Sequence, residues 1–367
     1  MAVGQKPWPK DRDHAFAGNS GFSRSSNILV AALTGRPSAS WVNTTASSQH
    51  GSGSASSPKA TEGCSLCPPR CATTAAAIRP AVSCGINWID TAAIYGLGHS
   101  EEVVAAALSD IPRGERPYVF TKCGLIGDPA NPNAGPKQVG APASIRRELE
   151  ASLRRLRTDH IDLYQMHWPA EDGTPLDEYW QTLLDMKREG KVGAIGLSNH
   201  NVAQLEAAEA LGHVDTLQPP FSAIKRKVGA AELGWCAAHG TGVIVYSPMQ
   251  AGLLSGSFSV ARAAALPAND WRSRNAEFKG EALTRNLAVA EAMRTIAEYH
   301  GTSVGAVAIA WTLAWPGVTA AIVGARSPLQ VDGWLDAASL SLNEGEMAAI
   351  AWAIELSGAG SGPARPV

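Results

Sequence analysis

Long apolar runs and an excess of charge of one sign are both missing from this chain of 367 residues. No stretch approaches the roughly 18 apolar residues that a membrane span requires, and the longest early run, Ile28 to Leu33, is far too short. The formal net charge of -2 provides no global field that would attract nucleic acid or a membrane surface. We therefore expect a cytoplasmic protein with neither of these partners, and the sequence leaves its oligomeric state open.

The cysteine spacing of common zinc sites is absent as well. Of the six cysteines, three lie close together: Cys64, Cys67 and Cys71. They lack a second Cys-x-x-Cys pair or histidines at zinc-site spacing, so we predict no metal. A chain of this length without a secretion signal favours free thiols over disulfides.

Residues 36 to 59 contain no acidic residue and show neither a helical nor a strand period. Such a Ser/Ala/Gly/Thr-rich composition is typical of a low-complexity segment. We predict that residues 1–70 are atypical and disordered, that residues 71–357 form the folded domain, and that residues 358–367 are a flexible tail.

A regular alternation of strands and helices begins near Thr73 and continues almost to the C-terminus. Seven apolar runs read as strands: Ile86 to Asp90, Tyr118 to Lys122, Ile161 to His167, Ala194 to Ser198, Thr216 to Gln218, Gly242 to Ser247 and Ala320 to Gly324. Strict alternation predicts a parallel α/β sheet. Because no Gly-x-Gly-x-x-Gly turn follows the first strand, we favour a (β/α)8 TIM barrel over a doubly wound sheet. Its first strand is irregular or missing, since only Asn27 to Leu33 is available for it.

Several helices have recognisable ends. Ser144 is a candidate N-cap for a helix whose Ile145, Leu149, Leu153 and Leu156 form one apolar stripe. Thr174 and Pro175 are candidates for the cap and first residue of the next helix. Pro80 falls inside a helical segment, where a proline costs about 3 kcal/mol.

Four polar residues lie at strand ends or in the loops just after them: Asp90, Tyr95, Lys122 and His167. Taken singly, a strand-end Asp or Tyr is more often a helix cap or part of the core edge. Four at the carboxyl ends of strands are typical of the active face of a barrel enzyme. A phenol beside an ammonium and a carboxylate is a candidate proton donor, because a nearby cation lowers the pKa of the phenol.

Six motifs, in order, resemble the aldo-keto reductase family: GINWIDTAAIYGLGHSEE from Gly85, FTKCG, IDLYQMHWP, KVGAIGLSN, YSPMQAGLLSG and IVGARSPLQ. The resemblance covers about residues 73–356; residues 1–70 do not match. It implies a catalytic tetrad of Asp90, Tyr95, Lys122 and His167 that reduces aldehydes or ketones with NADPH. Tyr95 would donate the proton, Lys122 would lower its pKa, Asp90 would orient the ammonium, and His167 would hydrogen-bond the carbonyl oxygen.

The same resemblance implies the cofactor contacts. Ser198, Asn199 and Gln218 match positions that bind the carboxamide, Tyr246 matches the stacking aromatic, and Ser247, Leu253 and Ser255 match the pyrophosphate stretch. Gly324, Arg326 and Gln330 match the segment that binds the adenosine 2'-phosphate. Arg326 favours NADPH over NADH, because a guanidinium suits a phosphate dianion. Gly333 and Trp334 replace the usual adenine-contacting pair, which weakens that preference.

The substrate is specified only as a small carbonyl compound. Trp168 and Trp271 are candidate walls of an apolar pocket, although Trp271 could instead anchor its own loop. Two alternatives to an active reductase stay open: a nucleotide-binding regulatory subunit without appreciable turnover, and a product made non-functional by its aberrant N-terminus.

Overall fold

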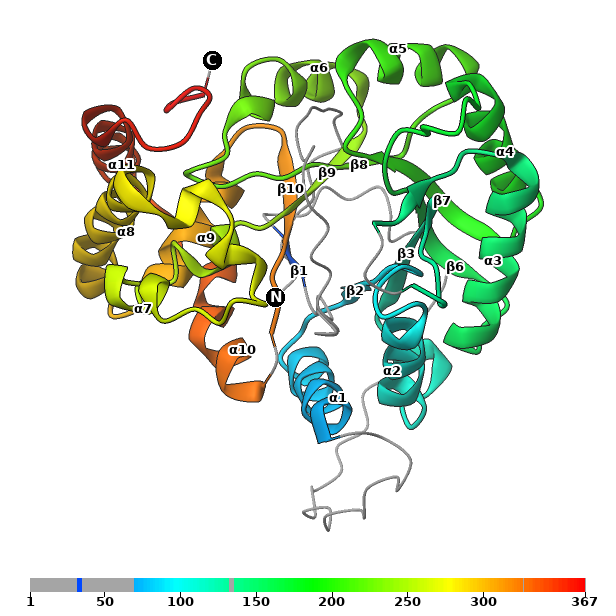
Figure 1. Ribbon diagram of the computed structural model, residues 1–367, viewed down its shortest axis with the longest axis horizontal. Helices are drawn as coiled ribbons and strands as arrows, with labels where there is room; N and C mark the ends of the chain where they lie inside the picture. Colours follow the sequence, from blue (N-terminus) through cyan, green and yellow to red (C-terminus); the bar gives the residue numbers. More distant parts are fainter. Residues whose placement is uncertain (1–31, 35–68, 132–134, 326, 367) are drawn as a thin grey trace, which may run out of the picture.

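The computed structural model describes residues 32–34, 69–131, 135–325 and 327–366. Within this part of the chain, seven parallel strands curve into a nearly closed barrel surrounded by helices (Figure 1). The parallel strands are β2 (Trp88–Asp90), β3 (Tyr118–Cys123), β6 (Ile161–Met166), β7 (Val192–Ser198), β8 (Thr216–Gln218), β9 (Gly242–Tyr246) and β10 (Val318–Ile322). They include all seven predicted strands, and the sheet order β10-β9-β8-β7-β6-β3-β2 follows the sequence.

Helices alternate with the strands and form the outer layer of the barrel (Figure 1). They are α1 (Pro69–Ser83), α2 (His99–Leu108), α3 (Pro142–Leu156), α4 (Leu176–Arg188), α5 (Val202–Leu211), α6 (Glu232–His239), α7 (Val260–Ala264), α8 (Gly280–His300), α9 (Val304–Ala314), α10 (Pro328–Leu335) and α11 (Glu344–Ser357). A small hairpin, β4 (Leu125–Ile126) with β5 (Lys137–Gln138), follows β3. None of the helices in the described ranges is long and apolar enough to cross a bilayer.

The two faces of the strands support two hydrophobic clusters. Alternate residues of each strand point to opposite faces, so Leu163 belongs to the small cluster inside the barrel, whereas its neighbour Tyr164 belongs to the larger one under the helices. The inner cluster consists of Trp88, Phe120, Leu163, Ala194, Ile244, Ala320 and Ile322. Trp88 stacks on Phe120 with ring centroids 4.8 Å apart, which fills the barrel with side chains. The polar site therefore lies above this apolar plug.

The first strand is irregular, as the sequence predicts. β1 (Ala32–Thr34) pairs antiparallel with β10, with Ala32 opposite Ile322, instead of adding a parallel strand between β10 and β2. Only Ala32 and Leu33 of the predicted run belong to it, because residues 27–31 lie outside the described part. The sheet ends at β1 and β2, which are not joined by ladder hydrogen bonds.

Two predicted helix starts are wrong by a few residues. α3 begins at Pro142 with Ala141 as its cap, and Ser144 instead donates its hydroxyl to Glu148 at 3.4 Å from within the first turn. α4 begins at Leu176, so Pro175 is the cap residue and Thr174 lies outside. In both cases a proline with fixed φ occupies the helix start. The predicted stripe on α3 is confirmed, since all four of its apolar side chains are buried.

The C-terminal residues take a defined course, although the sequence suggests a flexible tail. The backbone of Ser361 accepts a hydrogen bond from the Arg226 amide at 2.9 Å and donates one to the Ile224 carbonyl at 3.1 Å. Gly360 and Gly362 pass so close to this segment that a Cβ on either would overlap its backbone. Residues 358–366 therefore pack against the loop after β8.

Candidate active site

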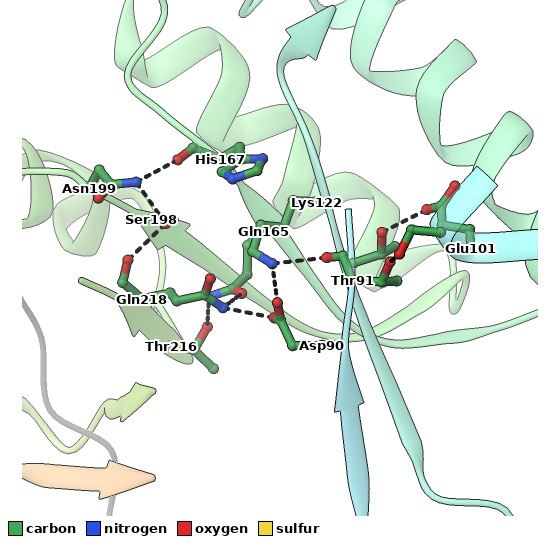
Figure 2. A network of polar contacts seen from close by, with 12 residues as sticks. Asp90, Thr91, Glu101, Lys122, Gln165, His167, Ser198, Asn199, Thr216 and Gln218 are labelled. Carbon is green, nitrogen blue, oxygen red and sulfur yellow. Dashed lines mark hydrogen bonds and ion pairs between the residues drawn. The ribbon is translucent and has the colours of Figure 1, made fainter. Parts of the chain in front are cut away.

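The carboxyl ends of neighbouring parallel strands bring the predicted polar residues to one rim of the barrel. Asp90 is the last residue of β2, Lys122 lies near the end of β3, and His167 directly follows β6. Lys122 is opposite Gln165 in the β3–β6 ladder. Figure 2 shows Asp90 and Lys122 in one polar network, which His167 joins through its main-chain carbonyl.

A buried ion pair lies at the centre of this network. Lys122 Nζ is 2.5 Å from Asp90 Oδ2 and donates a second hydrogen bond to the Thr91 carbonyl at 2.9 Å. Both charged side chains are almost completely buried. Burial raises the pKa of Asp90 and lowers the pKa of Lys122, while their mutual attraction opposes both shifts. Two charges are thus held in a position that costs desolvation energy.

Amide side chains extend the pair across the barrel. Gln218 Nε2 donates to Asp90 Oδ1 at 2.8 Å and to Gln165 Oε1 at 3.0 Å, and Gln165 Nε2 donates to Thr216 Oγ1 at 2.9 Å (Figure 2). All these side chains are buried. Gln218, which the resemblance places on a cofactor carboxamide, thus uses its amide nitrogen to orient Asp90. This chain of hydrogen bonds holds the Asp90 carboxylate in one orientation. The carboxylate in turn holds the Lys122 ammonium.

Tyr95 and His167 lie beside the ion pair. Lys122 Nζ is 5.6 Å from the centroid of the Tyr95 ring, and the rings of Tyr95 and His167 meet edge to face with centroids 5.8 Å apart. Burial, followed by the charge of Lys122, lowers the pKa of His167 well below its usual value. The imidazole is therefore neutral near pH 7 and can still donate one hydrogen bond.

The expected lowering of the Tyr95 pKa is not what this geometry produces. Burial, followed by the negative charges of Asp90 and an ionised Tyr246, raises the pKa of Tyr95 above its usual value. The Lys122 ammonium does not reverse this shift, and it donates its hydrogen bonds to Asp90 and to the Thr91 carbonyl. Tyr95 consequently keeps its proton at neutral pH.

A second hydrogen-bonded group lies at the end of β7 and β9. Asn199 Nδ2 donates to the His167 carbonyl at 3.1 Å and to Ser198 Oγ at 3.0 Å, while Tyr246 donates its hydroxyl to Asn199 Oδ1 at 2.9 Å. Ser198 Oγ in turn donates to the Gln218 carbonyl at 2.7 Å. The structure thus brings all the predicted carboxamide-binding and stacking residues to the same rim as the ion pair.

The loop after β9 has an unusual backbone. Ser247, Gln250 and Ala251 have positive φ angles of 59°, 44° and 51°, which non-glycine residues rarely adopt. Ser255 donates its hydroxyl to the Gly252 carbonyl at 2.7 Å. Leu253 is fully buried in the core, backbone included, so the structure offers no exposed Leu253 atom to a ligand.

The segment after β10 is only partly described. Gly324 is exposed at the end of the strand and Gln330 is exposed in the first turn of α10, whereas Arg326 lies outside the described residues. Trp334, one of the two departures from the family pattern, is 3% exposed and packs into the core. Its ring therefore does not replace the usual adenine contact.

The two candidate pocket tryptophans differ in their surroundings. Trp271 meets Phe278 edge to face with ring centroids 5.7 Å apart, and Phe278 packs in the same way on Phe258. This contact favours the interpretation that Trp271 anchors its own loop. Trp168 is partly buried directly after His167, where it can form one side of a pocket.

Sequence reasoning missed the interior polar residues of the network. Gln165 is completely buried and links Gln218 to Thr216, yet it lies within an apolar strand motif. The signal that could have found it is the two-residue period of β6, which places Gln165 on the same face as His167. For metals, no cluster of His, Cys, Asp or Glu suited to an ion occurs among the described residues. The side chains of Cys64, Cys67 and Cys71 lie outside them.

Comparison with known proteins agrees with the geometry. A model of the aldo/keto reductase family matches residues 68–355. The chain is 30% identical over 272 residues to aldo-keto reductase YhdN of Bacillus subtilis, covering 74% of this chain and 80% of that protein. It is 32% identical over 276 residues to the NADH-specific methylglyoxal reductase of Escherichia coli, covering 72% and 82%.

A solved structure gives the same result. The glycerol dehydrogenase AKR11B4 of Gluconobacter oxydans has a TM-score of 0.74 and 35% identity, with 80% of this chain and 88% of that chain covered. The family model alone spans well over half of the present chain. The chain belongs to the aldo-keto reductase family, and it is an NAD(P)H-dependent oxidoreductase that acts on carbonyl compounds.

Proposed function

We propose that this enzyme reduces small aldehydes or ketones to alcohols with NADPH as cofactor and Tyr95 as the proton donor. The observation that carries the proposal is the convergence of the Asp90–Lys122 ion pair, Tyr95 and His167 at one rim of the barrel. Each of these side chains has a separate chemical task.

The residues beside the ion pair suit a nicotinamide cofactor. Hydroxyl and amide groups of Ser198 and Asn199 match the donor and acceptor pattern of a carboxamide. The Tyr246 hydroxyl is held by Asn199, which orients an aromatic ring at the same rim. When bound, the cofactor supplies the hydride for the carbonyl carbon.

The protein's part of the chemistry concerns the carbonyl oxygen. A neutral His167 donates a hydrogen bond that polarises and positions the carbonyl. Tyr95 holds its proton until negative charge develops on the oxygen, and then transfers it, because an alkoxide is a stronger base than a phenolate. The Lys122 ammonium, kept in place by Asp90, lies 5.6 Å from the centroid of the Tyr95 ring and offsets only part of the effect of burial on the phenolate that remains. A raised pKa of Tyr95 is therefore compatible with its role as the acid.

Replacement of Tyr95 tests this assignment. We expect Tyr95→Phe to lower kcat for carbonyl reduction by about 10²- to 10⁴-fold, the usual contribution of a general acid. The measurement is NAD(P)H oxidation with a panel of aldehydes and ketones that includes methylglyoxal. Tyr118→Phe is the matched control, because Tyr118 is 51% exposed at the opposite end of β3. Equal rates for Tyr95→Phe and the native enzyme would exclude Tyr95 as the donor.

Thermal unfolding with each cofactor tests the choice of NADPH. A ligand present at 100 times its Kd stabilises the folded form by about 2.7 kcal/mol. We expect NADPH to raise Tm at lower concentration than NADH, and the Tyr95→Phe protein to show the same rise. A larger response to NADH would instead align this enzyme with the NADH-specific methylglyoxal reductase that it resembles.

A further inference from the structure

A second ion pair, with a buried carboxylate and a partly exposed arginine, lies beside the proposed catalytic residues. Glu101, near the start of α2, has a completely buried side chain, and both of its oxygens are used. Oε1 accepts a hydrogen bond from Thr121 Oγ1 at 2.6 Å, and Oε2 accepts one from Arg155 Nε at 2.6 Å. One carboxylate thus connects α2, β3 and the end of α3.

Each side of this contact is connected to a proposed catalytic residue through the adjacent backbone. Thr121 immediately precedes Lys122. Ser100, which immediately precedes Glu101, donates its amide to the Tyr95 carbonyl at 3.1 Å. The Ser100 hydroxyl lies 2.7 Å from Thr91 Oγ1, and the Thr91 carbonyl accepts a hydrogen bond from Lys122 (Figure 2). Glu101 therefore joins the loop that carries Tyr95 to the strand that carries Lys122.

Arg155 also covers the backbone of the Tyr95 loop. Gly98 has φ +98°, and a Cβ at this position would lie 2.5 Å from Arg155 Cδ and 2.6 Å from its Nε. Gly96 and Leu97 have positive φ angles as well, 63° and 54°. For Leu97 such a conformation costs about 1 kcal/mol or more and persists only where its surroundings enforce it. The guanidinium and its stem are part of those surroundings.

We propose that Glu101 and Arg155 are positioning residues that fasten the Tyr95 loop to β3 and so hold the phenol in register with the Lys122 ammonium. Both side chains act through the loop and not by contact with substrate or cofactor. The expected effect on kcat rests on the proposed function, whereas the attachment of the loop to β3 does not. A misplacement of about 1 Å can lower a rate by about 10²-fold, so release of this loop is expected to lower kcat.

Two glycines provide a matched pair for the first test. Gly98→Ala places a methyl group against Arg155 and also introduces strain at positive φ. Gly85→Ala introduces the same strain at φ +96°, but nothing lies within 4 Å of its Cβ position. We expect Gly98→Ala to lower kcat by about tenfold or more relative to Gly85→Ala.

The second test removes the ion pair itself. Arg155→Met alone leaves the Glu101 carboxylate buried and unpaired, which is strongly destabilising, so the double variant Glu101→Gln/Arg155→Met accompanies it. Arg146→Met is the control from the same helix, because Arg146 is exposed and its partner Glu189 lies at the surface, 2.8 Å away. We expect the pair variants to lose kcat with unchanged cofactor-induced Tm shifts, and the control to behave like the native enzyme.

Amide hydrogen exchange of residues 92–100 decides the inference independently of turnover. We expect exchange in this segment to rise by about tenfold or more in the pair variants, with β6 and β7 unchanged. Unchanged exchange together with kcat within about twofold of the native value would overturn the proposal. If the native enzyme reduces no carbonyl compound, the proposed function fails, and exchange alone then decides whether the pair holds the loop.

Discussion

The Asp90–Lys122 pair shows that the fold accepts a cost in desolvation free energy to place two single residues. Two opposite charges buried at 2.5 Å attract each other strongly, but their removal from water costs several kcal/mol per ion. Replacing a buried ion pair with apolar residues of similar size is often neutral or stabilising. The surrounding hydrogen bonds from Gln218 and to the Thr91 carbonyl hold one geometry of the pair. Its value therefore lies in positioning an ammonium at the rim and not in stability.

Glu148 is a partly buried carboxylate of a different kind. Its Oε2 accepts a hydrogen bond from the Gly124 amide at 3.0 Å, just after Lys122 and Cys123. No ion pair involves this carboxylate within the described ranges, and its charge raises the pKa of the neighbouring Cys123 and Tyr164 side chains. Burial raises the pKa of Glu148 to about 7, while the Gly124 amide, Ser144, Arg147 and Arg155 oppose the shift.

This shift predicts an unusual dependence of stability on pH. A carboxyl group with a raised pKa binds more protons in the folded state than in the unfolded state, so the free energy of unfolding falls as pH rises from about 4.5 to about 7. We expect Glu148→Gln to be more stable than the native protein at pH 8 by about 2 kcal/mol, less than the full shift because the side chain is partly exposed. The two proteins should converge below about pH 4. Urea unfolding at several pH values measures the difference.

A neighbouring residue on α3 serves as the control. Glu150 is exposed and pairs with Lys191 at 2.5 Å, which lowers the pKa of its carboxyl group. Its contribution has the opposite sign, because stability from this pair is present above the unfolded pKa and is lost as pH falls. A Glu148→Gln protein that loses stability at pH 8 would show that the buried carboxylate is needed in its charged form.

At the scale of elements, α1 carries a proline in its interior. The helix runs from Pro69 to Ser83 and continues through Pro80, although this residue has no amide hydrogen for the carbonyl four residues earlier. Packing explains why the helix persists: Ala77, Ile78 and Ala81 are completely buried. Tertiary contacts thus override a local cost of about 3 kcal/mol.

Replacement of this proline should stabilise the protein. We expect Pro80→Ala to raise the free energy of unfolding by about 1–2 kcal/mol, because it restores one helical hydrogen bond and removes a steric clash, while the unfolded chain gains some entropy. Pro142→Ala is the control, since Pro142 occupies the first position of α3, where proline is well tolerated. Denaturant titration compares both with the native protein. Equal effects of the two substitutions would refute this explanation of α1.

Elements with strong local patterns could be predicted, whereas contacts between distant segments could not. The α3 stripe from Ile145 to Leu156 repeats every three or four residues, so its burial follows from the helix period alone. Ser144 failed as a cap because the fixed φ of Pro142 starts the helix three residues earlier than a Ser144 cap would. Gln165 and Gln218 are 53 residues apart, and no local pattern marks a hydrogen bond between two strands. The same holds for Glu101 and Arg155.

At the scale of the whole molecule, the described N-terminal and C-terminal segments pack against the barrel in different places. Among the described residues before α1, the antiparallel β1 lies beside β10, and no described strand closes the ladder between β10 and β2. The C-terminal side returns from α11 and lies against the loop after β8. Arg226, 3% exposed, holds this return, and burial lowers its pKa to about 10, which still leaves it charged at neutral pH.

The Arg226 guanidinium is satisfied almost entirely by backbone carbonyls, several of which belong to the tail. It donates to Pro363 at 3.0 Å, to Ala359 at 3.1 Å and to Gly362 at 3.2 Å, and within its own loop to Ala223 and Ile224. Deletion of residues 359–367 removes three of these acceptors and leaves a charged group short of partners. We expect a loss of about 2–4 kcal/mol in the free energy of unfolding.

A double-mutant cycle tests whether Arg226 is the reason for this loss. In the full-length protein, Arg226→Met leaves the tail carbonyls without their donor and is expected to destabilise by a similar amount. In the truncated protein the same substitution should cost at least about 1 kcal/mol less, because the partners are already gone. Arg365→Ala, at an exposed ion pair with Glu355, should change stability by less than about 0.5 kcal/mol. Additive effects of truncation and Arg226→Met, measured by urea unfolding, would mean that the tail is held by other contacts.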